Sequence, residues 1–249
     1  MQQRTIVARV HHSLLASCER RALIWLAARL PSMVSPDFLT LFGVLGALLC
    51  GLSYIASSFS PRFLWLASVG LIINWFGDSL DGTLARFREI ERPRYGFFID
   101  HTTDVASQVF IFMGLGASPY MRFDTACLAL LSYWMAALYT FIRAIAVNVF
   151  QISYWGVGPT EIRLALLAYN FSLLLIGPLS LKTSYGPLAP IDFFCGGLFV
   201  VVFASFLMLV WQEGRRLAEL EKSLSSARGE GVIDIANSAC AERRQPTPR

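Results

Sequence analysis

Six long apolar runs follow one another along this chain, and they decide what it can fold into. Each run approaches the roughly 20 residues that a helix needs to cross a bilayer. Lipid offers no hydrogen-bond partner to an open backbone, so such runs are expected to be helices. The predicted spans are residues 37–58, 62–86, 95–117, 123–148, 161–181 and 191–211.

The composition also points to lipid as the solvent. Hydrophobic residues make up 55% of the 249 and charged residues only 15%, against the roughly 45–50% apolar content of soluble domains. The spans use most of the chain, so the chemistry is expected within the bundle or at its ends. The predicted class is an all-α polytopic membrane protein, with one six-helix domain over residues 36–214 and no nucleic-acid partner.

Two polar segments, residues 1–35 and 215–249, flank this domain. Residues 14–30 mix apolar side chains with arginines, which predicts an amphipathic helix lying in the headgroup layer. A short positively charged leader is the alternative. Pro31 ends this helix and Pro36 opens the first span. The C-terminal tail is Ser-, Glu- and Arg-rich, so we expect it to begin helical and to end disordered.

Basic residues are distributed unevenly between the two ends of the predicted bundle. Arg88, Arg92 and Arg94 crowd the second connection, whereas the first, third and fifth connections carry one basic residue each. Five arginines also precede the first span. The positive-inside rule therefore places both termini and the second connection in the cytoplasm. We expect an integral protein of a bacterial inner membrane.

The five cysteines give no sign of a disulfide framework or a zinc site, because they are scattered and odd in number. Residues 15–18, Leu-Ala-Ser-Cys, resemble a lipoprotein cleavage box. The preceding His-His-Ser at 11–13 leaves no continuous apolar stretch for a signal peptide, so a lipoprotein is not expected.

Four carboxylates lie inside the second and third predicted spans, where each charge costs roughly 2.5–3.5 kcal/mol. Asp78 and Asp81 are three residues apart on one helix face, with Asn74 a turn earlier. Asp100 and Asp104 are four apart on the next helix. The spans are antiparallel, so both acidic faces lie within about three turns of the loop that joins them. The pattern predicts a carboxylate cage near the cytoplasmic surface.

Such a cage needs cations, because like charges repel and desolvation penalises each of them. Oxygen-only ligands, with no His or Cys at the spacing of a further metal ligand, favour Mg²⁺ or Mn²⁺ over zinc. Two such ions could bridge a pyrophosphate, so the predicted chemistry is phosphoryl transfer. Small residues at 82, 85 and 96 would let a nucleotide approach closely. Arg86, one turn beyond Gly82, could clamp a phosphate.

The sequence DSLDGTLAR at residues 78–86, followed after nine residues by Gly96, Asp100 and Asp104, resembles the signature of the CDP-alcohol phosphotransferase family. All eight signature residues are present. The resemblance implies a six-helix fold with an N-terminal interfacial helix, a homodimer and a role in phospholipid biosynthesis. It also implies the reaction, which is transfer of a substituted phosphate from a CDP-alcohol to an acceptor alcohol, with release of CMP.

The same resemblance assigns a role to each signature residue. Its four carboxylates would bind the metal ions, and Asp104 would also take the proton of the acceptor hydroxyl. Four residues would contact the cytidine diphosphate part of the donor: Gly82, Ala85, Arg86 and Gly96.

The acceptor site has several candidates, each with a competing interpretation. With His101 beside Asp100, the segment resembles the choline and ethanolamine phosphotransferase branch of the family. His101 either supports its neighbour by a hydrogen bond or takes part directly in catalysis. Arg143 and Arg163 could bind an acceptor phosphate or extend to lipid headgroups. Glu161 could attract an ammonium group or favour a helix N-terminus. These candidates point to different acceptors.

Two other functions compete with the enzyme. Intramembrane acids also mark ion paths, but a transporter would spread them over several helices and depths. A catalytically silent scaffold would not need all eight signature residues. CMP release separates the enzyme from both alternatives.

Overall fold

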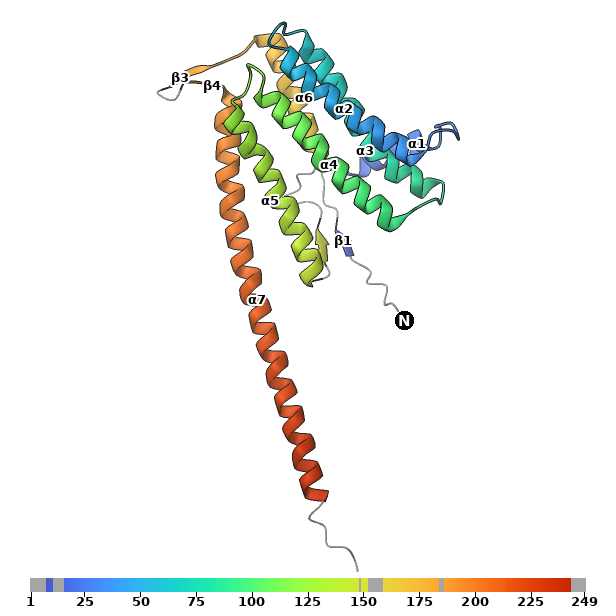
Figure 1. Ribbon diagram of the computed structural model, residues 1–249, viewed down its shortest axis with the longest axis vertical. Helices are drawn as coiled ribbons and strands as arrows, with labels where there is room; N and C mark the ends of the chain where they lie inside the picture. Colours follow the sequence, from blue (N-terminus) through green and yellow to red (C-terminus); the bar gives the residue numbers. More distant parts are fainter. Residues whose placement is uncertain (1–7, 11–15, 148, 152–158, 184–185, 243–249) are drawn as a thin grey trace, which may run out of the picture. The chain divides into compact units, whose positions relative to one another are not determined.

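The computed structural model describes residues 8–10, 16–147, 149–151, 159–183 and 186–242, and these are mostly helical (Figure 1). The helices in chain order are α1 (Ala16–Ala27), α2 (Pro36–Ala56), α3 (Phe63–Phe87), α4 (Pro93–Gly116), α5 (Phe123–Val147), α6 (Pro159–Ile176) and α7 (Pro190–Glu242).

Two pairs of three-residue strands lie outside the helices. The sequence did not predict them. The strand β1 (Ala8–Val10) pairs in parallel with β2 (Val149–Gln151). The strand β3 (Leu181–Thr183) pairs antiparallel with β4 (Gly186–Leu188), between α6 and α7.

Five of the described helices are long and apolar enough to cross a membrane: α2, α3, α5, α6 and α7. The remaining predicted span corresponds to α4, whose first half carries Arg94, Asp100 and Asp104. These charged residues lower its hydropathy, so α4 is not among the helices that qualify as spans. The chain is a helical polytopic membrane protein with five candidate spans, and the sixth stays a prediction.

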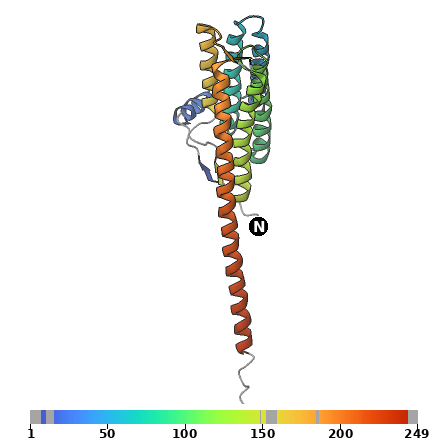
Figure 2. The same cartoon turned by 90° about the vertical axis from the view of Figure 1, so that its left-hand side faces the viewer.

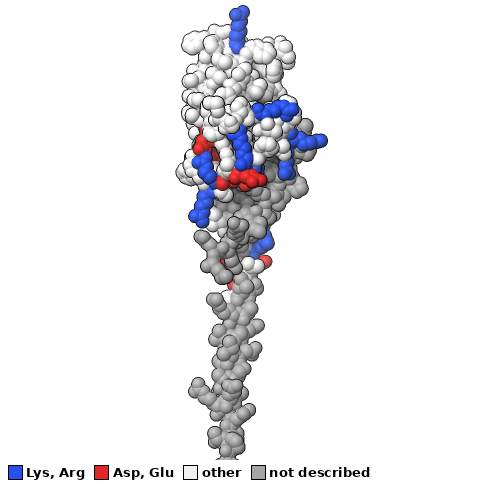
Figure 3. All heavy atoms as spheres, turned by 90° about the vertical axis from the view of Figure 1, so that its right-hand side faces the viewer, with Lys and Arg blue, Asp and Glu red and all other residues white. Residues whose placement is uncertain are grey.

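The surface of the described bundle agrees with this assignment. On the face shown in Figure 3, acidic and basic side chains gather mainly in one band, and most of the remaining described surface carries neither charge. Large apolar side chains are exposed along the helices, among them Leu52, Val69 and Leu138. Lipid is the solvent in which such exposure costs least.

The chain divides into two compact units, residues 1–202 and 203–249. The first contains α1 to α6 and the beginning of α7. The second continues α7 as a helix to Glu242. The predicted polar tail is thus helical as far as Glu242, and its last residues, 243–249, lie outside the described part of the chain.

Helix starts follow from local sequence. The Ser35 hydroxyl accepts the backbone N–H of Phe38 at 3.1 Å and so caps α2, with Pro36 at its first position. Proline also opens α4, where its missing N–H is no loss.

Arg88, just after α3, donates to the carbonyls of Pro31 and Val34 and ties the end of α3 to the link before α2.

Helix α1 lies against one side of the bundle (Figure 2). Its buried Leu23 and Ala27 pack on Leu39, Leu80 and Leu84 of α2 and α3. The opposite face of α1 exposes arginines and a tryptophan. Helix α1 thus falls within the predicted segment 14–30, and its amphipathic role in the headgroup layer stays a prediction.

A buried polar chain links three helices of the bundle. The Tyr54 hydroxyl on α2 donates to Asn170 Oδ1 on α6 at 3.0 Å. Asn170 in turn donates to the Ser68 hydroxyl on α3 at 3.1 Å. Polar side chains that bond across helices help to hold membrane bundles together. These hydrogen bonds fix α6 against α2 and α3, and α3 carries Asp78.

Glycines allow α2 to approach α3 and α4 closely. A Cβ added to Gly77 would lie 2.4 Å from the carbonyl oxygen of Leu39. A Cβ added to Gly51 would lie 2.3 Å from that of Phe110. No real side chain fits at such distances, so these glycines set how deeply the helices pack. Gly77 directly precedes Asp78 and therefore helps to place it.

We expect Gly114→Ala to lower the thermal unfolding midpoint of the detergent-solubilised protein. The new Cβ would lie 2.4 Å from Gly51 Cα, so α2 and α4 would have to separate. Overpacking of this kind costs about 1–3 kcal/mol. Gly196→Ala is the matched control, because a Cβ there meets nothing within 4 Å. Equal midpoints for the two variants would contradict the close packing of α2 on α4.

Candidate functional site

Three carboxylates from two neighbouring helices meet in the bundle. Asp78 of α3 and Asp100 and Asp104 of α4 each offer an oxygen, and these oxygens all lie within 4.8 Å of one another. The three side chains are half-buried. A short connection, residues 88–92, joins the antiparallel helices, so acidic faces close to that connection come together. We call these three residues the carboxylate cluster.

A small cavity lies beside the carboxylate cluster, between α2, α3 and α4. Its walls are mostly small or polar, which leaves space next to two of the carboxylates. The lining residues are Thr40, Gly43, Val44, Asn74, Asp78, Thr103, Asp104 and Ser107.

Asp81, predicted as a fourth ligand, is turned toward α2. It is buried, and its Oδ2 accepts the Thr40 hydroxyl at 2.5 Å. Its Oδ1 accepts the backbone N–H of Gly82 at 2.5 Å. Asp81 remains within electrostatic reach of Asp78 and Asp100. Its part in holding a cation stays a prediction.

Arg163 of α6 reaches the carboxylate cluster from the side. Its Nη2 donates to Asp78 Oδ2 at 2.6 Å, and its Nε donates to Asn74 Oδ1 at 3.0 Å. The Asn74 amide donates in turn to the carbonyl of Gly43 at 3.1 Å. The Arg163 side chain is only 12% exposed. The structure thus places this arginine on a carboxylate of the cluster, where its charge offsets part of the acidic charge.

The residues predicted to contact the nucleotide lie around the end of α3 and the start of α4. Arg86 reaches back along α3, where Nη2 donates to the Thr83 hydroxyl at 3.3 Å and Nη1 lies 3.4 Å from the position of a Gly82 Cβ. Ala85 is half-buried. A Cβ at Gly96 would meet nothing within 4 Å. Open space therefore faces the first turn of α4.

Besides Arg163, one other predicted acceptor residue, His101, lies beside the carboxylate cluster. Its Nδ1 is 3.6 Å from Asp100 Oδ2, and its ring contacts Phe97 and Phe141 edge-on at centroid distances of 4.2 and 5.1 Å. Arg143, half-buried, lies on α5 two residues after Phe141. Glu161 lies in the first turn of α6, also half-buried. The structure brings His101 and Arg163 to the cluster.

Three polar neighbours of the site were not among the predicted site residues. Asn74 could have been singled out, because it lies one turn before Asp78 on the same helix face. Thr40 on α2 carries no comparable signal. Tyr133 on α5, within electrostatic reach of Asp104 and Arg163, carries none either. Both come near the carboxylates only through helix packing.

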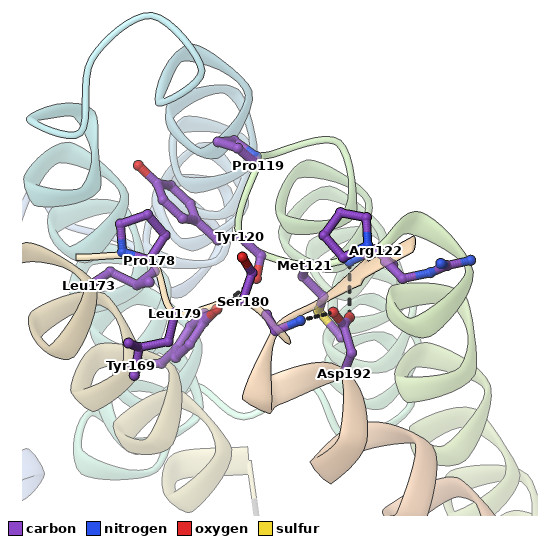
Figure 4. A pocket seen from close by; sticks show the side chains of 12 residues that line it. Pro119, Tyr120, Met121, Arg122, Tyr169, Leu173, Pro178, Leu179, Ser180 and Asp192 are labelled. Carbon is purple, nitrogen blue, oxygen red and sulfur yellow. Dashed lines mark hydrogen bonds between the residues drawn. The ribbon is translucent and has the colours of Figure 1, made fainter. Parts of the chain in front are cut away.

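A larger cavity of about 390 Å³ lies at the opposite end of the bundle, where α4 joins α5 and α6 joins α7 (Figure 4). Asp192 in its wall accepts the backbone N–H groups of Arg122 and Ala189 at 3.0 and 2.8 Å. The Tyr169 hydroxyl donates to the carbonyl of Tyr120 at 2.7 Å. These contacts hold the two loops at this end of the bundle together.

Comparison with known proteins identifies the family. A family model for CDP-alcohol phosphatidyltransferases matches residues 33–211, which is most of the chain and includes the whole carboxylate cluster. The chain belongs to this family. The family predicted from the motif is therefore confirmed.

The chain is also similar to cholinephosphotransferase 1 from Gallus gallus, with 30% identity over 154 residues. The aligned part covers 57% of this chain and 44% of the relative, so the chain matches less than half of that protein's length. The expected bacterial inner membrane finds no support in this comparison, because the relative is from chicken.

Proposed function

We propose that this chain is a divalent-cation-dependent CDP-alcohol phosphotransferase of phospholipid synthesis. It transfers a substituted phosphate from a CDP-alcohol to an acceptor alcohol, with release of CMP. The observation that supports this most strongly is the meeting of Asp78, Asp100 and Asp104 within 4.8 Å in a chain of this family.

The donor set fits hard divalent cations. The carboxylate cluster offers only oxygen, as Mg²⁺ and Mn²⁺ prefer. Arg163 brings one positive charge to a site with four carboxylates, which is too little to balance them. Asp78, Asp100 and Asp104 would hold a first ion, and Asp81 would complete the site for a second. Ions held by these residues would supply positive charge to offset that of the donor diphosphate and of the departing CMP.

The nucleotide end of the donor is assigned to the loop side of the cluster. Arg86 lies over Gly82 with its guanidinium near the helix surface, where it can pair with a phosphate oxygen. Ala85 and Gly96 leave room for the cytidine diphosphate. In this position the β-phosphorus faces the carboxylate cluster.

Asp104 is assigned as the general base. Its carboxylate borders the small cavity that Ser107 also lines, one turn further along α4. An acceptor hydroxyl held there would give its proton to Asp104 as its oxygen attacks the β-phosphorus. Holding the acceptor oxygen in line with the β-phosphorus lowers the activation barrier, because the two reactants no longer lose translational and rotational freedom during the reaction.

We favour a CDP-amino alcohol as donor and an apolar alcohol such as diacylglycerol as acceptor. The similarity to a cholinephosphotransferase supports this choice, and so does His101 beside Asp100. Glu161 would then attract the ammonium group of the donor. Arg163 pairs with Asp78, so its charge has a role at the site even with an acceptor that carries no phosphate. Arg143 remains the candidate for such a phosphate in the other branches.

The proposal includes a membrane topology and an assembly. Both termini and the carboxylate cluster would lie on the cytoplasmic side, where the water-soluble nucleotide meets a membrane lipid. The protein would act as a homodimer, as the family resemblance implies.

A substrate panel tests the proposal. Purified protein with Mg²⁺ or Mn²⁺ is given CDP-choline, CDP-ethanolamine or CDP-diacylglycerol with matching acceptors, and CMP is measured. We expect CMP from an amino alcohol donor with diacylglycerol. CMP only from CDP-diacylglycerol with a water-soluble alcohol would move the chain to the phosphatidyl-transferring branch. No CMP from any pair, or flux across vesicles without CMP, would reject the enzyme.

A further inference from the structure

Glu19, in the first turn of α1, connects two other helices through one carboxylate oxygen. The side chain is half-buried. Its Oε1 accepts three hydrogen bonds, from Trp75 Nε1 at 2.8 Å, the Thr160 hydroxyl at 2.9 Å and the Ser79 hydroxyl at 3.4 Å. Trp75 and Ser79 belong to α3, and Thr160 belongs to α6. The carboxylate therefore joins three helices at a single point.

This junction lies next to the carboxylate cluster. On α3, Trp75 and Ser79 bracket Asp78 in the sequence. On α6, Thr160 comes three residues before Arg163, which donates to Asp78 at 2.6 Å. The same part of α3 is thus linked twice to the beginning of α6, directly through Arg163 and indirectly through Glu19.

The energetics favour a specific role for the carboxylate. Hydrogen bonds to a charged acceptor are roughly twice as strong as those between neutral groups. All three donors are neutral groups on side chains that are partly shielded from water. Without Glu19, the first turn of α6 would lose the hydrogen bond that Thr160 donates beside the site. A shift of about 1 Å in a positioning group can cost 10²-fold in rate.

We propose that Glu19 is a positioning residue: through it, α1 holds the first turn of α6 on α3 and so keeps Arg163 against Asp78. The effect on turnover rests on the proposed function, whereas the link between α1 and α6 does not. The N-terminal helix α1 then has a role at the site in addition to its predicted place in the headgroup layer.

The link is tested by thermal unfolding of Glu19→Ala, Thr160→Val and the double variant in detergent. If the two side chains contact each other, the double variant unfolds no earlier than the less stable single variant. Additive losses would show that the contact is absent and would overturn the proposal. Arg20→Ala, an exposed neighbour on α1, is the control and should keep the wild-type midpoint.

Turnover, measured below all unfolding transitions, separates positioning from mere stability. We expect Glu19→Ala to lose about tenfold in kcat, and Glu19→Gln, which keeps an acceptor oxygen, to stay within about twofold of wild type. Unchanged kcat in Glu19→Ala, or an equal loss in both variants, would overturn the positioning role. If the wild type itself released no CMP, the proposed function would fail, while the unfolding cycle would still decide whether Glu19 links α1 to α6.

Discussion

Asp104→Asn is expected to lower cation-dependent CMP release by about 10³-fold or more while the protein still inserts and unfolds near the wild-type midpoint. The amide has the shape of the carboxylate but carries no charge for a cation and takes up no proton. Loss of a general base alone costs about 10²–10⁴-fold, and loss of a cation ligand adds to it. Turnover of the purified variant, against an equal amount of folded wild type, measures the effect.

The matched control is Asp124→Asn on α5. Asp124 pairs with Arg122 at 2.6 Å, and its side chain is 61% exposed, at the end of the bundle away from the carboxylate cluster. Removal of this charge should leave turnover within about twofold of the wild-type value, because exposed ion pairs contribute only about 0–1 kcal/mol to stability. Turnover of Asp104→Asn at the control's level would reject the assignment of the base.

The helices and the acidic faces could be predicted from the sequence because both are local properties. Apolar runs of helical length gave the ends of the long helices to within two residues, with two exceptions: α6 ends at Ile176 instead of the predicted 181, and the C-terminal helix continues to Glu242. The spacing of four between Asp100 and Asp104 puts both on one face of any helix. Because only five residues connect α3 to α4, the two helices lie close together, and Asp78 of α3 comes near Asp100 and Asp104 of α4.

The hydrogen-bond partners of these carboxylates could not be predicted, because they lie on other helices and depend on how those helices pack. Arg163 and Asp78 are 85 residues apart in sequence, and Thr40 and Asp81 are 41 apart. Which face of α6 or α2 turns toward α3 depends on contacts along the whole helix, including the glycine contacts of α2. A span pattern contains no such information. Glu19 was missed because it lies outside the motif, in the flanking helix α1, and only packing brings it to α3 and α6.

Removing divalent cations is expected to stop turnover completely, and the cluster geometry indicates which ions restore it. After EDTA treatment, Mg²⁺ or Mn²⁺ should return CMP release to its starting level. Zn²⁺ should not, because the cluster offers neither thiolate nor the imidazole pairs that favour zinc. EDTA saturated beforehand with Mg²⁺ is the control for effects of the chelator itself. Turnover that persists in excess EDTA would contradict a cation-dependent reaction.

Chelation alone does not locate the ion, because the donor diphosphate also binds Mg²⁺ in solution. A readout without nucleotide is therefore needed. Mn²⁺ should raise the unfolding midpoint of the wild-type protein, because a ligand that binds only the folded state stabilises it. Asp100→Asn should lose most of this shift, because it removes one of the three oxygens that lie within 4.8 Å of one another. Asp124→Asn should keep it. Equal shifts in all three proteins would place the cation away from the carboxylate cluster, even if EDTA abolished turnover.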